Sequence, residues 1–185
     1  ARINAFHMDA YCGLAPSAPQ GFGNFLRAAI FEKAPFRSVH YLNGNAADIP
    51  AECARYGALL EAFPTDIVCL GIGENGHIAF NDPPVANFRD PVLCKQVALD
   101  PVCREQQVHD GCFSALEQVP THALTLTVPA LCSGKEMFCV VPAATKANAV
   151  YATVRGSFGE HCPATVLREH PAAILYLDAD SAAKL

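Results

Sequence analysis

Residues 66–84, with the sequence DIVCLGIGENGHIAFNDPP, decide how the rest of the chain is interpreted. The apolar run at residues 66–70 is typical of a buried strand, and Gly71, Gly73 and Gly76 then match the pattern G-x-G-x-x-G. That pattern binds a dinucleotide only where a helix opens on its last glycine. Here Asn81–Pro84 would interrupt such a helix within two turns. We therefore interpret the glycines as a turn that lets the backbone approach a ligand closely.

Strand-like and helix-like segments alternate along the rest of the chain. This alternation predicts one α/β domain over residues 1–185, with a mostly parallel sheet covered on both faces. In such sheets, ligands bind at the carboxyl ends of the strands. The predicted strands are residues 2–6, 38–42, 66–70, 94–99, 122–128, 135–141 and 172–178, and the predicted helices are residues 21–33, 50–62, 101–110, 144–154 and 163–169.

Composition and charge exclude several classes of protein. Hydrophobic residues make up 51% of the chain, which argues against disorder. The net charge of -5 comes without a basic stripe, so neither nucleic acid nor an anionic membrane is expected as the main partner. No apolar run is long enough to span a bilayer, and residues 1–11 do not resemble a signal peptide. Because the chain opens in a strand-like run, we expect a preceding strand and helix to be missing.

The nine cysteines are best interpreted as free thiols in a reducing compartment, which predicts a cytoplasmic protein. Their number is odd, no C-x-x-C occurs, and several lie in apolar runs such as IVCL and MFCVV. A zinc site is the weaker interpretation, because no pair of cysteines or histidines has ligand spacing. We expect no metal and no cofactor.

His77 is the candidate for chemistry, because it lies on the glycine loop at the predicted ligand-binding edge. Asn75 and Asp82 are near it in sequence, and Asp9 follows another strand that ends on the same edge. A carboxylate beside an imidazole orients it and stabilises its cation, which suits proton transfer at neutral pH. The alternative is a buried histidine in a structural turn. With no serine or cysteine nucleophile motif, the residues favour cofactor-free acid–base chemistry on a small polar substrate.

The segment GIGENGHIAFNDP closely resembles the signature of the glucosamine-6-phosphate deaminase (isomerase) family. FHMDAYCGL, YLNGNAADIPAECARY, VPTHALTLTVPAL, VVPAATKANAVY and CPATVLREHPAAILYLD resemble further family segments in the same order. PQGFGNF and CREQQVHDGCF resemble a branch called galactosamine- or glucosamine-6-phosphate isomerases. The resemblance implies a Rossmann-like three-layer α/β/α fold. It also implies conversion of an amino-sugar 6-phosphate and water into a ketose 6-phosphate and ammonia, without metal or cofactor.

The resemblance also implies catalytic roles for individual residues. His77 would open the sugar ring as an acid–base group, and Asp9 would move the C2 proton to C1. Asp82 stands where the family has a supporting glutamate, and Asn75 stands where many members have an aspartate. An asparagine can orient His77 but carries no charge to stabilise its cation. Asp82 is one methylene shorter than glutamate, which leaves its reach to His77 open.

Substrate and phosphate binding are implied for a second set of residues. Lys146 lies in the segment that supplies a phosphate-binding lysine, and Gly73 and Gly76 would bring the backbone close to the substrate. The family's arginine falls near Gln107, and Arg104, one turn away on the same helical face, is the candidate substitute. The family's N-terminal phosphate loop has no counterpart in this sequence.

Two other functions remain open at this point. A 6-phosphogluconolactonase has a comparable glycine–histidine turn, but it continues as GHTASLFP where this chain has HIAFNDP. A non-catalytic sugar-phosphate-binding protein is the second alternative, because Asn75 and Asp82 depart from the family's acids. The sequence does not distinguish glucosamine from galactosamine, and it leaves the oligomeric state open, a homo-oligomer included.

Overall fold

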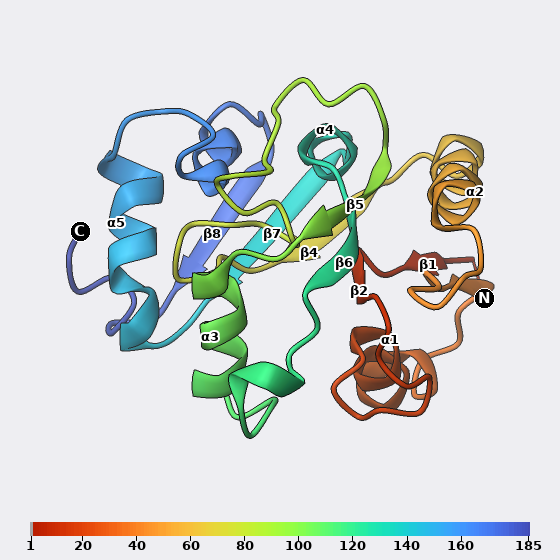
Figure 1. The fold of residues 1–185 in the computed structure, drawn as a ribbon. Coiled ribbons are helices and arrows are strands. Elements are labelled where there is room, and N and C mark those ends of the chain that lie inside the picture. Colours follow the sequence, from red (N-terminus) through yellow and green to blue (C-terminus); the bar gives the residue numbers. More distant parts are fainter. Residues whose placement is uncertain (1) are drawn as a thin grey trace.

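The computed structural model describes residues 2–185 as a mixed α/β fold (Figure 1). The strands are β1 (Asn4–Phe6), β2 (Asp9–Tyr11), β3 (Ser38–His40), β4 (Ile67–Leu70), β5 (Cys94–Ala98), β6 (His122–Leu126), β7 (Glu136–Val141) and β8 (Ala173–Leu177). The α-helices are α1 (Phe22–Leu26), α2 (Ile49–Ala62), α3 (Pro101–His109), α4 (Val128–Cys132) and α5 (Ala147–Arg155). A π-helical turn η1 (Arg27–Phe31) follows α1, and 3-10 turns are η2 (Leu116–Gln118), η3 (Ala144–Lys146) and η4 (Pro163–Arg168).

Seven of the eight strands fall within the seven predicted apolar runs. The exception is β2, whose sequence DAY begins with the charged Asp9 and forms no apolar run. The predicted helix at residues 21–33 is α1 followed by η1, and the segment at residues 163–169 is a 3-10 turn. Asp48 and Asp100 fix the starts of α2 and α3, where their side chains accept hydrogen bonds from Ala51 N and Val102 N, both at 2.9 Å.

The strands form three separate sheets, two parallel and one antiparallel. The parallel sheets are β1–β3 and β4–β7–β8, whereas β2, β6 and β5 pair antiparallel in the order β2–β6–β5. The prediction of one mostly parallel sheet was therefore too simple. An apolar run indicates a buried strand but not its direction, so the runs at residues 94–99 and 122–128 looked the same as the parallel ones.

One face of the β4–β7–β8 sheet packs into the main core, and the other is open. Val68, Met137 and Cys139 point into the core, which α4, α5 and η4 complete. The residues that alternate with them, among them Ile67 and Val140, are 58% and 56% exposed. Among residues 2–185, α4, α5 and η4 pack against one face of this sheet, and the covering of its other face stays a prediction.

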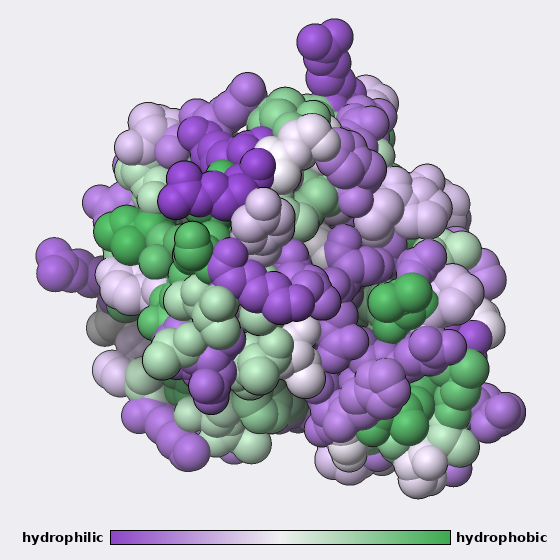
Figure 2. All heavy atoms as spheres, turned by 90° about the vertical axis from the view of Figure 1, so that its left-hand side faces the viewer, coloured by the Kyte–Doolittle hydropathy of each residue, from purple (hydrophilic) through white to green (hydrophobic). Residues whose placement is uncertain are grey.

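The nine cysteines are all free, and they differ in environment. Cys94, Cys103, Cys139 and Cys162 are buried, whereas Cys112 and Cys69 are exposed. Cys69 lies in β4 as predicted, but it faces the open side of the sheet. Figure 2 shows polar side chains interrupted by separate apolar patches on the face that carries the C-terminal elements. No helix within residues 2–185 is long and apolar enough to cross a membrane.

Candidate active site

The glycine loop after β4 holds the imidazole of His77 in a defined place. Gly73 N donates to His77 O at 2.9 Å and closes the turn. A Cβ on Gly73 would lie 2.0–2.3 Å from the His77 ring atoms Cε1, Nδ1 and Nε2. The ring therefore occupies the space that any side chain at position 73 would need. This contact gives Gly73 a physical role that composition alone did not reveal.

Gly76 serves the same loop in a different way. Its φ of +84° lies in the left-handed region, which favours glycine. A Cβ there would also lie 2.6 Å from Cys162 Sγ, and Gly76 O accepts a hydrogen bond from Ala164 N at 2.9 Å. Gly76 thus fastens the loop to η4. The structure explains both glycines by packing, and their predicted contact with substrate stays a prediction.

Asn75 and Asp82 both reach His77. The His77 Nδ1–H group faces Asn75 Oδ1 at 2.7 Å and Asp82 Oδ1 at 2.9 Å. The Asn75 amide orientation is fixed, because its Oδ1 also accepts from His77 N at 3.0 Å and its Nδ2 donates to Asp82 Oδ1 at 3.0 Å. With two oxygens facing Nδ1, the neutral ring carries its proton there. Nε2 has no hydrogen-bond partner among residues 2–185 and is not enclosed, so it is available to a substrate.

Asp82 is a fully buried carboxylate that stays ionised through its contacts. Its exposed fraction is 0%, and burial by itself would raise its pKa. The hydrogen bonds from His77 and Asn75, with the bond from Asp100 N to Oδ2 at 3.3 Å, outweigh burial and lower the pKa below its usual value. The shorter side chain therefore does reach His77, which was left open by the sequence.

Asp9 lies in β2, which pairs with β6, and β6 supports the segment that follows the glycine loop. It pairs with Thr125 of β6, and Thr125 Oγ1 accepts a hydrogen bond from Phe80 N at 3.0 Å, two residues before Asp82. Burial raises the pKa of Asp9 to about 7. A carboxyl group with that pKa is half ionised at neutral pH, which suits a general base. Thr125 was missed from the sequence because its role depends on a pairing distant in sequence.

Lys146 and Arg104 have different surroundings. Lys146 is the last residue of η3, which follows β7. The strand β4 pairs parallel with β7 and leads into the glycine loop. Lys146 and the glycine loop therefore follow strands that end at the same edge of the sheet. Lys146 is partly exposed, and its side chain makes no hydrogen bond or ion pair within residues 2–185, whereas its backbone N donates to Ala143 O at 3.1 Å. Arg104, by contrast, donates from one Nη to Leu116 O and Val119 O, both at 2.8 Å. These bonds tie α3 to η2, and a phosphate would have to compete with them.

Backbone strain is concentrated on the same edge. Among residues 2–185, the non-glycine residues with positive φ are Ala79 at 49° and Ala143 at 80°. Ala79 lies two residues after His77, and Ala143 lies three residues before Lys146. Such conformations cost free energy and persist where the surrounding structure enforces them, often at functional sites.

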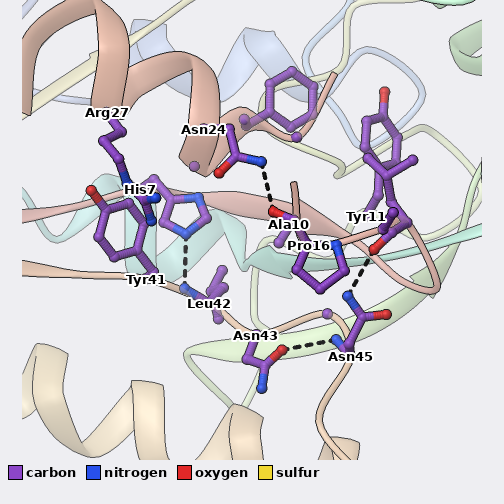
Figure 3. A pocket seen from close by; sticks show the side chains of 16 residues that line it. His7, Ala10, Tyr11, Pro16, Asn24, Arg27, Tyr41, Leu42, Asn43 and Asn45 are labelled. Atoms are coloured by element: carbon purple, nitrogen blue, oxygen red, sulfur yellow. Dashed lines mark hydrogen bonds between the residues drawn. The ribbon is translucent and has the colours of Figure 1, made fainter. Parts of the chain in front are cut away.

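A cavity lies beside this site rather than in it. It has a volume of about 270 Å³ and lies between α1, the end of β2 and the loop after β3. Figure 3 shows His7, Asn24 and Tyr41 around it, with His7 Nε2 accepting from Leu42 N at 2.8 Å. None of the predicted site residues lines this cavity.

Comparison with known proteins identifies the class. The family model for glucosamine-6-phosphate isomerases/6-phosphogluconolactonase matches residues 13–175. The chain therefore belongs to the glucosamine-6-phosphate isomerase/6-phosphogluconolactonase family. This result confirms the family that the sequence motifs indicated.

Individual relatives show which members of the family this chain resembles. A glucosamine-6-phosphate deaminase of Bacillus cereus is 35% identical over 180 residues, which cover 97% of this chain and 67% of that protein. The glucosamine-6-phosphate deaminase of Listeria monocytogenes is 34% identical over 99% of this chain and 76% of its own. The solved structure of a monomeric glucosamine-6-phosphate deaminase superposes with a TM-score of 0.88 at 30% identity, over 97% of this chain and 74% of that one. A 6-phosphogluconolactonase of Trypanosoma brucei shares the fold with a TM-score of 0.76 at 17% identity.

Proposed function

We propose that this protein is an amino-sugar-6-phosphate deaminase, which converts glucosamine 6-phosphate or galactosamine 6-phosphate and water into the ketose 6-phosphate and ammonia. The observation that carries this proposal is the His77 ring, with Nδ1 held by Asn75 and Asp82 and Nε2 left free. The similarity to several proteins named glucosamine-6-phosphate deaminase supports it over lactone hydrolysis.

His77 would open the sugar ring. Its Nε2 takes the proton of the anomeric hydroxyl, and the resulting imidazolium returns a proton to the ring oxygen. Asp82, 2.9 Å from Nδ1, stabilises the cation between these two steps. Asn75 contributes orientation only, because an amide carries no charge.

Asp9 would carry out the isomerisation of the open-chain sugar. Its carboxylate takes the proton from C2 while a proton of the substrate ammonium group passes to O1, which gives an enolamine, and Asp9 then returns its proton to C1. The imine at C2 then adds water and releases ammonia, which leaves the ketose. The pKa of about 7 allows Asp9 to accept and release a proton at neutral pH.

The phosphate group would bind at the sheet edge near Lys146. The side chain of that lysine has no partner within residues 2–185, and the residue precedes the first turn of α5, where backbone N–H groups also favour an anion. Arg104 stays a weaker candidate, since its Nη bonds to two carbonyls would have to break. Gly73 and Gly76 would let the substrate approach the loop backbone.

Two broader features belong to the same proposal. We infer a Rossmann-like three-layer arrangement, in which the open face of β4–β7–β8 is the position of the third layer. The Bacillus relative has about a third of its length outside the match. We also infer a cytoplasmic setting, because nine free thiols suit a reducing compartment.

The direct test measures products from three substrates. Ammonia and a ketose 6-phosphate are expected from glucosamine 6-phosphate, galactosamine 6-phosphate or both, and slow hydrolysis at most is expected from 6-phosphogluconolactone. Lactone hydrolysis without ammonia release would reverse the assignment. Saturable binding of an amino-sugar phosphate without turnover would favour the non-catalytic alternative.

A further inference from the structure

A third potential metal ligand lies against the His77–Asp82 pair. Cys103, in the first turn of α3, is 1% exposed. One ligand atom from each of His77, Asp82 and Cys103 lies within 4.8 Å of the other two, and all three residues are buried. Within residues 2–185, no other three histidine, cysteine or acidic residues meet in this way.

The fold positions Cys103 through the start of α3. Asp100 caps this helix, and its backbone N–H group donates to Asp82 Oδ2 at 3.3 Å. The first turn of α3 is thereby fixed on the Asp82 carboxylate, with the Cys103 thiol beside it. Burial and the neighbouring Asp82 charge raise the pKa of this thiol, so without a metal it stays protonated.

We propose that His77 Nδ1, one Asp82 carboxylate oxygen and Cys103 Sγ form a binding site for a thiophilic divalent cation of the Zn²⁺ type, and that the bound cation inhibits the enzyme. Nitrogen, oxygen and sulfur are the ligands that Zn²⁺ prefers, and three protein ligands leave the fourth tetrahedral position to water. Ligand atoms around such an ion are about 3.3–3.7 Å apart. The Nδ1–Oδ1 distance of 2.9 Å must therefore lengthen by about 0.5 Å.

The proton balance of binding is simple. The Cys103 thiol loses its proton to solvent and becomes the thiolate ligand. His77 stays neutral, but its proton moves from Nδ1 to Nε2, because the metal takes the Nδ1 lone pair. One proton is released for each ion bound, and no oxidant or reductant takes part.

This tautomer change explains the inhibition, a step that rests on the proposed function. With the metal on Nδ1, Nε2 carries a proton and has no lone pair to accept one from the anomeric hydroxyl. Asp82 is also bound to the ion and no longer stabilises an imidazolium. Ring opening should therefore stop while substrate still binds.

Metal binding is tested without any need for activity. The whole protein is stripped with a chelator and titrated with Co²⁺ under reducing conditions. One equivalent should give a thiolate-to-cobalt absorption band and the visible spectrum of a tetrahedral site, and Zn²⁺ should displace it. Cys103→Val should remove the band and weaken Zn²⁺ binding at least about 100-fold, since a direct ligand is lost.

Matched variants make the result specific. Cys112→Ser removes an exposed thiol close to the end of α3 and should keep both the band and the affinity. Cys103→Ser provides a smaller change if the valine variant does not fold, as judged by circular dichroism, and should also lose the band. A wild-type spectrum without the thiolate band, or a Cys103 variant that binds Zn²⁺ as tightly as wild type, would overturn the proposal.

An activity assay with added Zn²⁺ distinguishes failure of the metal site from failure of the proposed function. If amino-sugar phosphates are turned over, each protein is assayed with increasing Zn²⁺ and compared with its own rate without Zn²⁺. Inhibition of wild type and of Cys112→Ser should require a Zn²⁺ concentration at least about 100-fold lower than inhibition of Cys103→Val. Turnover with no Co²⁺ binding refutes the metal site alone. A thiolate–Co²⁺ spectrum with no turnover of any amino-sugar phosphate refutes the proposed function alone.

Discussion

At the scale of single residues, the central finding is that one amide and one carboxylate together hold His77. Asn75 fixes the tautomer of the ring, and Asp82 supplies the negative charge. The sequence raised the question of how His77 is supported when Asn75 stands where many family members have an aspartate. The answer is that Asn75 orients the ring while Asp82 carries the charge. It also predicts unequal effects for the two side chains.

Asp82→Asn should lower kcat by about 10²- to 10⁴-fold, because the imidazolium loses its charge partner. Asn75→Ala should have a smaller effect, since it removes an orienting group and leaves the carboxylate. Steady-state kinetics on the amino-sugar phosphate gives the comparison. Equal rates for Asp82→Asn and wild type would show that the pair is structural.

Gly73→Ala should displace the His77 ring, because the new Cβ would lie 2.0–2.3 Å from three ring atoms. We expect kcat/KM to fall at least about 100-fold, since misplacing a catalytic group by 1 Å can cost that much. Gly71→Ala is the matched control, because its Cβ would be 3.4 Å from Val140 O and need no displacement. In a His77→Gln background, Gly73→Ala should cost little more activity, and an undiminished effect there would contradict the ring displacement.

The residues of the site were partly predictable. His77, Asp9, Asn75 and Asp82 could be nominated because they stand close to strand ends and match family motifs. The place of Cys103 could not, because it meets Asp82 only through the folding of α3 onto the loop. No local spacing carries that information.

At the scale of elements, the antiparallel β2–β6–β5 sheet links Asp9 to the His77 loop. Thr125 is the connection, since it pairs with Asp9 in β2 and its Oγ1 accepts from Phe80 N. Neither the strand β2 nor the antiparallel direction was predicted. The β2 sequence DAY forms no apolar run, and hydrophobic runs look alike in either direction. The helices α2 and α3 were predicted well. Each begins with an aspartate N-cap and has a proline in its first turn.

Thr125→Val should leave Phe80 N buried without an acceptor and lower the free energy of unfolding by about 1–3 kcal/mol. Because the loop loses its attachment, kcat should fall as well. Thr127→Val is the control: Thr127 is equally buried, but its hydroxyl bonds to Val92 O at 2.8 Å, away from the loop. Urea unfolding and kinetics should show lost stability in both variants and lost activity in Thr125→Val alone. Equal activity in the two variants would refute the link through β6.

At the scale of the whole molecule, the site contains two acids, the buried Asp82 and the partly exposed Asp9, whose contributions to stability depend on pH. Asp82 has a lowered pKa, so it stabilises the fold above the unfolded-state pKa of about 3.9, and this contribution is lost as the pH falls through its folded value. Asp9 has a raised pKa and acts in the opposite direction. Its contribution to the free energy of unfolding is fully present below about pH 4, where Asp9 is protonated in both the folded and the unfolded state. This contribution is lost as the pH rises through the folded-state pKa of about 7.

Asp9→Asn should therefore stabilise the protein at pH 8 and have little effect at pH 4. The shift from 3.8 to about 7 corresponds to about three pKa units, or at most about 4 kcal/mol, and less because Asp9 is partly exposed. Urea unfolding of both proteins between pH 4 and pH 8 measures this difference. A difference that stays constant with pH would show that Asp9 is not a destabilised buried carboxylate.

The overall architecture was predictable as α/β, but the open face of β4–β7–β8 was not. Ile67 and Val140 alternate with core residues, and an apolar residue on either face of a strand gives the same sequence signal. Which face is covered depends on the helices that pack there, and those contacts are distant in sequence.

The most direct test of the account follows the hydrogen at C2 and the ammonia together. Wild-type protein is incubated with glucosamine 6-phosphate and galactosamine 6-phosphate, and ammonia release and isotope transfer from C2-deuterated substrate to C1 are measured beside Asp9→Asn and His77→Gln. We predict ammonia and a C1-labelled ketose from wild type, and loss of both signals in each variant. Wild-type rates in both variants would contradict the assignment of Asp9 and His77 as the groups that carry the reaction.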